Sequence, residues 1–476
     1  MSSTQPNILL VVSEDNGQHL GCYGDPFVDT PRLDQLASEG VRFANAYTTQ
    51  AVCSPARASI LTGLYPHQNG QLGLATHKYA MYEKFPNIPA LLKPEGYRTG
   101  IIGKLHVNPE STFPFDFWWN DRNYISFAHR DMQKATTMAD GFINASDAPF
   151  FLMVNYPDAH LPFLHQECGL PETPYTADAV ETLPFIGIDT PRLRQHTADY
   201  YNCMSRLDTG IGMLLESLDR SGKADDTLVV FTTDHGAQLS RGKTTIYEGG
   251  LRVPSIVRWP GRVNEGLVRD ELVSHIDILS TIMDVAGLPV PESVTGISLL
   301  PLMRGMSVSW RDHLYAEWIS GGPTIYFPQR SVRDGRFKFI ISLLPDRPSP
   351  SAMCYSGPGQ IWESGAALEE IAAAGSRIRR AYDVFAHPPP EELYDLEKDP
   401  WEFENLAGDP EHALEQDRLR AQLRSWQETT GDALLDPCCL DRLTVEHDHI
   451  TAAYYPDAWG TSREYDWQYS EYLHKK

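Results

Sequence analysis

The sequence predicts an α/β protein with a large, mixed but mostly parallel central sheet flanked by helices, followed by a smaller C-terminal α+β domain. Over the first two-thirds of the 476 residues, short apolar runs alternate with segments of helical periodicity, which is typical of β-α-β units. After about residue 310 the pattern changes to a hairpin followed by helices. We therefore divide the chain into an α/β domain of residues 1–310 and a C-terminal domain of residues 311–476 with a small antiparallel sheet.

Four apolar runs are expected to form buried parallel strands of the central sheet. Each is short, apolar at successive positions and rich in β-branched or aromatic residues, as strands covered on both faces are. The runs are NILLVV (7–12), YRTGII (97–102), FFLMVN (150–155) and TLVVFT (227–232).

Three segments between or after these runs predict helices. Residues 30–39 predict a helix with Thr30 as its N-cap and Pro31 in its first turn. Residues 193–220 and 273–285 also carry apolar positions at helical spacing.

The remaining pattern predicts loops and the C-terminal elements. Stretches rich in Pro and Gly at 157–191 and 319–328 predict loops, which often shape binding sites. RSVRDGRFKFIISLL (330–344) predicts a β-hairpin with its turn at Asp334-Gly335, and residues 412–430 predict a helix.

Composition and charge exclude several classes of function. The formal net charge is −23, from 40 Lys and Arg against 63 Asp and Glu, so we expect no binding to nucleic acid or to an anionic membrane surface. The longest apolar runs are too short to span a bilayer. The first residues show no signal peptide, so we expect a cytoplasmic protein, or a periplasmic or exported one if a signal has been removed. The sequence does not predict an oligomeric state.

The seven cysteines show neither CxxC nor Cys/His metal spacing. A disulfide framework is therefore not expected, and a reducing compartment or a single special cysteine fits this usage better.

Carboxylates follow two of the four predicted strands. Glu14 and Asp15 come soon after the first run, and Asp234 and His235 come soon after the fourth. Carboxyl ends of parallel strands meet at one edge of a sheet, and oxygen ligands without a thiolate pair favour Ca²⁺ or Mg²⁺. The alternative is that these residues merely begin loops, which is less favoured for two such pairs than for one.

Cationic side chains follow the other two strands. Lys104 and His106 come after the second run, and His160 comes a few residues after the third. In an extended segment Lys104 and His106 would point the same way. Taken singly, each is more simply read as a solvated lysine or a loop histidine, but a cationic cluster beside a metal site predicts binding of a phosphate or sulfate.

The segment AVCSPARASILTG (51–63) places a cysteine at a predicted helix start. Ser54 is a good cap, Pro55 favours a first turn, and Arg57 would come round on the next turn to hold an anion or the acidic ligands. From the residues alone, Cys53 could be a buried structural thiol or a reactive thiolate, although sulfur is a poor neighbour for a hard metal ion.

The segment also resembles the signature of the sulfatase family, C-x-P-x-R followed by S-x-L-T-G. Further segments resemble the family in the family's order, so the resemblance spans nearly the whole chain, and two of them are most similar to its heparan N-sulfatase (sulfamidase) branch. The general segments are TTDHG (232–236), YEGGLRVP (247–254) and ELYDLEKDPWEFENLA (392–407), and those similar to the branch are HQNGQLGL (67–74) and GIIGKLHVNPESTFPFDF (100–117).

The resemblance implies an alkaline-phosphatase-like fold and hydrolysis of sulfate esters or N-sulfates with release of inorganic sulfate. It implies that a formylglycine-generating enzyme converts Cys53 to Cα-formylglycine, whose hydrate is the nucleophile, and that the substrate is a small aryl sulfate or sulfated sugar. The implied metal is Ca²⁺, with Mg²⁺ and Mn²⁺ as alternatives, and its implied ligands are Glu14, Asp15, modified Cys53, Asp234 and His235.

The resemblance also implies roles for the cations. Arg57 would brace the hydrate, and His106 would be the base that acts on its second hydroxyl. Lys104, His160 and Lys243 would bind sulfate oxygens, with His160 or Lys243 protonating the leaving group.

The chain departs from the family pattern at two ligand positions. The family usually has Asp where this chain has Glu14, and often Asn where it has His235. Both departures leave the identity and affinity of the metal open. Lys243 lies in a loop whose length varies in the family.

Two other functions are compatible with the same residues. One is a phosphonate monoester or phosphodiester hydrolase of the same superfamily, because sulfate and phosphate esters are similar in shape. The other is a protein that binds sulfated sugars without turnover, which the full set of cationic and acidic side chains disfavours.

Overall fold

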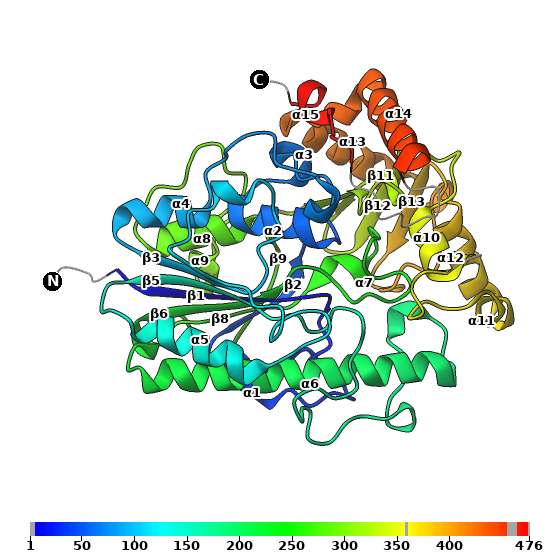
Figure 1. Cartoon of the computed structure of the whole chain (residues 1–476). Helices are drawn as coiled ribbons and strands as arrows, with labels where there is room; N and C mark the ends of the chain where they lie inside the picture. Colours follow the sequence, from blue (N-terminus) through cyan, green and yellow to red (C-terminus); the bar gives the residue numbers. More distant parts are fainter. Residues whose placement is uncertain (1–4, 358–359, 455–463, 475–476) are drawn as a thin grey trace.

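The computed structural model describes residues 5–357, 360–454 and 464–474 (Figure 1). These residues form a nine-stranded mixed sheet with the strand order β4-β3-β5-β1-β6-β8-β2-β7, and β9 pairs with β2 beside this path. Its strands are β1 (Asn7–Ser13), β2 (Val41–Tyr47), β3 (Arg98–Ile102), β4 (Phe117–Trp119), β5 (Phe150–Asn155), β6 (Thr227–Thr233), β7 (Arg252–Val253), β8 (Ser255–Arg258) and β9 (Leu267–Ser274).

The central part of this sheet is parallel. β1 pairs in parallel with β5 and β6, and β3 pairs in parallel with β4 and β5, whereas β8 is antiparallel to β6 and β2. The predicted mixed, mostly parallel sheet is confirmed, and all four predicted strands belong to its parallel part. Their carboxyl ends therefore lie at one edge of the sheet.

Helices cover both faces of the sheet (Figure 1). The described helices are α1 (Pro31–Ser38), α2 (Cys53–Thr62), α3 (Pro66–Asn69), α4 (Ile88–Leu92), α5 (Met132–Asn144), α6 (Pro191–Arg220), α7 (Glu248–Leu251), α8 (Asp277–Val285), α9 (Leu300–Met303), α10 (Pro350–Ser356), α11 (Leu368–Ala373), α12 (Ser376–Ala386), α13 (Ala413–Thr429), α14 (Pro437–Tyr454) and α15 (Tyr469–Tyr472). α1, α5 and α6 lie on one face, and α2, α4, α8 and α9 lie on the other. None of these helices combines the length and the apolar character needed to cross a membrane.

The two faces of β1 belong to different hydrophobic clusters. Leu9 and Val11 pack with residues of α1, α5 and α6, whereas Ile8, Leu10 and Val12 pack with residues of α2, α4 and α8. All five side chains are buried, because successive residues of a strand point to opposite faces and both faces are covered by helices. This explains why the run is apolar at every position.

The C-terminal region contains an antiparallel sheet in the order β10-β11-β12-β13. Its strands are β10 (Leu314–Ser320), β11 (Tyr326–Arg333), β12 (Phe337–Ser342) and β13 (Glu391–Asp395). The predicted hairpin is present, and Asp334 Oδ1 accepts hydrogen bonds from the backbone N–H groups of Arg336 and Phe337, both at 2.7 Å. α13 packs on this sheet through Leu419 and Leu423.

Two predicted boundaries are wrong. The helix expected over 273–285 begins only at Asp277, because residues 273–274 end β9, where the Asp277 carboxylate accepts the backbone N–H of Ser274 at 2.8 Å. The loop expected over 319–328 is confined to 321–325, since β10 and β11 extend into that stretch.

The expectation that Thr30 is the N-cap residue of α1 is confirmed, but its side chain makes no capping hydrogen bond. The Thr30 side chain accepts no hydrogen bond from the first turn of the helix; its hydroxyl donates instead to Asp34 Oδ1 at 3.1 Å.

Candidate active site

Cys53 lies in the first turn of α2, where free backbone N–H groups and the helix dipole favour negative charge. The thiol is nearly inaccessible, since the residue is 2% exposed. The expectation that Ser54 caps this helix is wrong, because the helix begins at Cys53 and its N-cap is Val52. The Ser54 hydroxyl instead accepts a hydrogen bond from the backbone N–H of Ala75 at 2.8 Å, which ties α2 to the loop after α3.

Acidic residues from two strand ends surround this cysteine. They come together because β1 and β6 are neighbouring parallel strands, so the loops that follow them start side by side. Two overlapping sets of side chains have their ligand atoms within 4.8 Å of one another. They are Asp15, Cys53, Asp234 and His235, and Glu14, Asp15, Cys53 and His160.

The donor atoms of this cluster fit a hard divalent cation. His235 Nε2 lies 3.3 Å from Asp15 Oδ1, 3.6 Å from Asp234 Oδ1 and 3.5 Å from Cys53 Sγ. Asp15 Oδ1 is buried without a hydrogen-bond partner among the described residues, which is costly unless another group neutralises it. Carboxylate oxygens suit Ca²⁺ or Mg²⁺, whereas the sulfur of Cys53 does not. The set is therefore better matched to a cation when oxygen replaces sulfur at position 53.

Arg57 connects the acidic cluster to the neighbouring strands. Its Nε donates to Asp234 Oδ2 at 3.1 Å, and its Nη2 lies 3.6 Å from Glu14 Oε1. Its Nη1 donates to the backbone oxygen of Lys104 at 3.0 Å and to Asn155 Oδ1 at 2.7 Å. The sequence left open whether Arg57 binds an anion or the acidic residues, and in the structure it contacts the carboxylates of Asp234 and Glu14.

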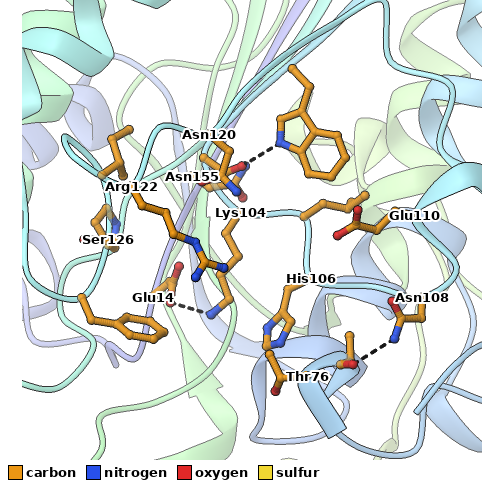
Figure 2. A pocket seen from close by; sticks show the side chains of 17 residues that line it. Glu14, Thr76, Lys104, His106, Asn108, Glu110, Asn120, Arg122, Ser126 and Asn155 are labelled. Atoms are coloured by element: carbon orange, nitrogen blue, oxygen red, sulfur yellow. Dashed lines mark hydrogen bonds and ion pairs between the residues drawn. The ribbon is translucent and has the colours of Figure 1, made fainter. Parts of the chain in front are cut away.

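Two lysines complete the charge balance. Lys104 Nζ donates to Glu14 Oε2 at 2.7 Å, and Lys243 Nζ donates to Asp15 Oδ2 at 2.7 Å (Figure 2 shows the first pair). Lys243 is buried, whereas Lys104 is partly exposed. Each lysine thus neutralises one carboxylate and leaves the second oxygen of that carboxylate for another ligand.

These contacts keep the acids ionised despite their burial. Burial raises the pKa of Asp15, but Lys243 and the nearby histidines outweigh it and lower the pKa to about 2. Burial likewise raises the pKa of Asp234, and His235 and Arg57 lower it to about 2. For His235, burial lowers the pKa, and Asp234 and Asp15 raise it to about 9. In the protein without a bound cation, the negative charge of Asp234 and Asp15 therefore keeps His235 protonated.

The two histidines of the cationic group have low affinity for protons. Burial lowers the pKa of His106 well below its usual value, with Lys104 and Arg57 acting in the same direction. Both ring nitrogens of His106 are buried without a hydrogen-bond partner among the described residues. Burial also lowers the pKa of His160. Asp15 raises this pKa and Lys243 lowers it further, and the resulting pKa is about 4. A neutral imidazole that lacks a partner is suited to accept a proton from a ligand.

The structure brings the sequence-predicted site residues to one edge of the sheet. Lys104 and His106 were expected to point the same way, and both line one pocket. The backbone of His106 is left-handed (φ 59°), however, and not extended. The residues in this group are Glu14, Asp15, Cys53, Arg57, Lys104, His106, His160, Asp234, His235 and Lys243.

Sequence reasoning missed two arginines that anchor the loop carrying His160. The buried Asp158 carboxylate accepts hydrogen bonds from Arg130 Nε at 2.9 Å and from Arg206 Nε and Nη2 at 2.8 and 2.7 Å. Arg130 Nη2 also donates to the backbone oxygen of His160 at 2.8 Å. No local sequence pattern predicts this triad of Asp158, Arg130 and Arg206, because its members come from three separate segments.

Asn155 was missed as well, although a signal for it existed. It is the last residue of β5, and its side chain accepts from Arg57 and donates to the backbone oxygen of Ile102 at 3.0 Å. The strand-end rule that pointed to the other site residues applies to it equally.

A pocket of about 440 Å³ opens onto this cluster through Glu14, Lys104 and His106 (Figure 2). Part of its wall comes from the segment 118–127, which begins within β4 and carries aromatic, amide and charged side chains. The pocket is large enough for a small organic molecule.

Two family models match the chain. The model for "Sulfatase" matches residues 6–288, and the model for "N-sulphoglucosamine sulphohydrolase, C-terminal" matches residues 240–344. Among curated proteins, the chain is 33% identical over 460 residues to N-sulphoglucosamine sulphohydrolase of Homo sapiens, covering 90% of each chain.

Solved structures agree with this fold. A structure in complex with its substrate D-glucosamine-2-N,6-O-disulfate matches with a TM-score of 0.67 and 21% identity, covering 90% of this chain and 99% of the other. The phosphonate monoester hydrolase of Agrobacterium radiobacter matches with a TM-score of 0.67 and 21% identity, covering 89% and 96%. The fold by itself therefore does not separate the two chemistries.

The family models and the identity to a sulfohydrolase over most of both chains identify the family. The chain belongs to the sulfatase family, close to the N-sulphoglucosamine sulphohydrolases, and it is a sulfuric ester hydrolase.

Proposed function

We propose that the protein is a metal-dependent sulfatase that removes sulfate from a small sulfated sugar, as an ester or an N-sulfate, using a formylglycine hydrate derived from Cys53. The observation that carries the proposal is the position of Cys53 Sγ within 4.8 Å of the ligand atoms of Asp15, Asp234 and His235, at a helix N-terminus. A thiol is a poor match for these donors, whereas a hydrate offers the oxygen that they suit. The relative in complex with a glucosamine disulfate supports a sulfated sugar as the substrate class.

Conversion of Cys53 requires a formylglycine-generating enzyme as a partner. The carboxylates of Glu14, Asp15 and Asp234, with His235, would hold one divalent cation, for which we propose Ca²⁺. When bound, the cation supplies Lewis acidity to oxygens at this site.

The residues of the chain perform the remaining steps. As one hydroxyl of the hydrate loses its proton and attacks sulfur, the bond from sulfur to the sugar oxygen or nitrogen breaks, and the sugar leaves as an alcohol or amine after taking up a proton. Lys104 and Lys243 stabilise the charge on the sulfate oxygens. His106 then removes the proton of the second hydroxyl, the bond from carbon to the sulfated oxygen breaks, and sulfate leaves as the aldehyde re-forms. An unmodified thiol or a serine has no second hydroxyl and would stay sulfated until water attacked.

His160 is the better candidate for protonating the leaving group. Lys243 is buried and bonded to Asp15, which raises its pKa and keeps its proton in place against the effect of burial. His160 is partly exposed, its Nδ1 is hydrogen-bonded to the backbone oxygen of Leu161 at 2.6 Å, and its ring stacks on Phe127 with the centroids 4.2 Å apart. The negative charge of a bound sulfate would raise its affinity for a proton.

Two measurements test the proposal. The first is the mass of the peptide that contains Cys53, which we expect to show replacement of the thiol by an aldehyde in protein made with the modifying enzyme. The second compares kcat/KM for an aryl sulfate, N-sulfoglucosamine and an aryl phosphonate ester on the converted protein. A faster rate on the phosphonate by orders of magnitude would overturn the proposal, and binding of sulfated sugars without turnover would identify a binding protein instead.

Cysteine variants supply the controls. Cys53→Ala should abolish turnover, whereas Cys354→Ala should retain it, because Cys354 is equally reduced and buried but lies in α10. An unmodified Cys53 peptide together with full activity of Cys53→Ala would show that Cys53 is a structural thiol.

A further inference from the structure

The pocket beside the catalytic cluster contains two charged side chains of opposite sign, Arg122 and Glu110. Arg122 and Glu110 both line it, and neither has an ion-pair or side-chain hydrogen-bond partner within the part of the chain that the structure describes. In Figure 2 the Arg122 guanidinium is directed into the pocket on the side of Lys104, whereas Glu110 lies on the opposite side, near Asn108. The pocket therefore has a basic wall and an acidic wall.

The same pocket exposes two large aromatic side chains. Trp118 is 40% exposed and Phe127 is 51% exposed, and both line the pocket. Trp118 is held in place because its Nε1 donates to the backbone oxygen of Gly103 at 3.1 Å. Exposed aromatic side chains in a groove typically mark a ligand site, and flat rings suit the apolar face of a sugar.

The polarity of the walls orients a charged ligand. The net charge of −23 opposes the approach of anions, so an unpaired arginine next to Lys104 is a local exception. The amide of Asn120 lines the pocket with Arg122 and offers further donors. Glu110 would repel an anionic group from the opposite wall.

From this arrangement we infer that the substrate carries a second anionic group, a sulfate or a carboxylate, that binds Arg122 while the scissile sulfate lies at Lys104 and Cys53. The inference rests on the proposed function and names its substrate class: a sugar with at least two negative charges. Arg122 is a specificity-determining residue, since its guanidinium can pair with two oxygens of a sulfate or carboxylate.

Three substrates test the inference and distinguish the source of the second charge. They are D-glucosamine-2-N-sulfate, D-glucosamine-2-N,6-O-disulfate and an N-sulfated glucosamine linked to a uronic acid. We expect the native protein to prefer one of the dianionic sugars, and we expect Arg122→Gln to reduce the ratio of kcat/KM between that sugar and the monosulfate by about tenfold, as loss of one charge-assisted contact in a partly exposed site predicts. The sugar whose advantage disappears identifies the group that binds.

Further variants separate charge from folding. Arg122→Lys should restore part of the ratio, whereas Arg304→Gln should leave it unchanged, because Arg304 is equally exposed but does not line the pocket. The preference of the native protein should also weaken at high salt, since Arg122 is accessible to solvent. An unchanged ratio in Arg122→Gln, or a native preference for the monosulfate, would overturn the inference.

A binding measurement keeps this test independent of turnover. Calorimetry with the Cys53→Ala protein should show tighter binding of the dianionic sugar than of the monosulfate, and this difference should shrink in the Cys53→Ala, Arg122→Gln double variant. If the difference is found while no substrate is hydrolysed by converted protein, the proposed function fails and the Arg122 site stands.

Discussion

The Lys243 ammonium donates a hydrogen bond to Asp15 Oδ2 at 2.7 Å, although 228 positions separate the two residues. Asp15 follows β1 and Lys243 lies in the loop after β6, so the pairing depends on the parallel alignment of these strands. Burial alone would favour the neutral form of both groups, and each keeps the other charged. The Lys243–Asp15 pair forms one side of the site that surrounds Cys53.

Removal of the Lys243 charge should impair catalysis. We expect Lys243→Met to lower kcat/KM about 10²–10³-fold, the size found when a group that stabilises transition-state charge is removed. Steady-state kinetics on an aryl sulfate measure the effect. Lys93→Met, which breaks an exposed ion pair with Asp116, is the control and should retain activity. Near-native kinetics for Lys243→Met would contradict the role proposed for this lysine.

Binding of a divalent cation should stabilise the protein. Because the cation would neutralise carboxylates that the folded chain gathers, Tm should rise with Ca²⁺ concentration and fall after chelation by EDTA. Asp234→Asn should reduce this response, whereas Asp178→Asn, on an exposed loop, should preserve it. A Tm that is the same with Ca²⁺ and with EDTA would show that the cluster binds no such cation.

The buried triad of Asp158, Arg130 and Arg206 should be a large contributor to stability. Asp158→Asn leaves two buried guanidinium groups without their shared anion, so we expect a loss of about 3–5 kcal/mol in the free energy of unfolding. Urea denaturation measures it. Asp448→Asn, which breaks an exposed pair with Arg347, should cost about 0–1 kcal/mol. Equal losses in the two variants would show that burial of the triad adds nothing.

The same carboxylate should shape the response to acid. Burial raises the pKa of Asp158, but Arg206 and Arg130 outweigh it and hold the pKa below its usual value. A depressed pKa in the folded state contributes stability that is present above the pKa of the unfolded chain and is lost as the pH falls. Stability should therefore decline less steeply below about pH 4 in Asp158→Asn than in the native protein. Parallel pH profiles would contradict this assignment.

Gly236 should be intolerant of a side chain. A Cβ at this position would lie 2.0 Å from the backbone oxygen of Gly249, so Gly236→Ala must displace the chain next to His235. We expect a loss of about 1–3 kcal/mol, as for other overpacked sites, together with weaker cation binding. Thermal unfolding with and without Ca²⁺ measures both effects. Gly141→Ala is the matched control: its Cβ would meet open space in α5, so the change should be neutral or stabilising. A Gly236→Ala protein as stable as native would refute the steric argument.

Local patterns predicted the parallel strands well, because strands buried on both faces are largely apolar at successive positions. They failed at Val273 and Ser274, where an apolar run that also fits a helix ends β9 instead. Periodicity cannot distinguish the two over a short run, and pairing of β9 with β2, more than 200 positions earlier in the chain, decides the outcome. Ser54 is a second example of what a local pattern cannot predict. It is a residue type that often caps helices, but its hydroxyl instead accepts a hydrogen bond from the backbone N–H of Ala75.

The α/β class, the chemistry at the strand ends and the family signature around Cys53 could be predicted from the sequence, because each depends on residues that are close together in the chain. The tertiary structure alone decided which cation neutralises which acid: Lys104 with Glu14, Lys243 with Asp15, and Arg57 with Asp234. It also decided that Arg122 faces the pocket, where no other described residue pairs with it. Such pairings depend on which strands are neighbours in the sheet, and a short stretch of sequence does not contain that information.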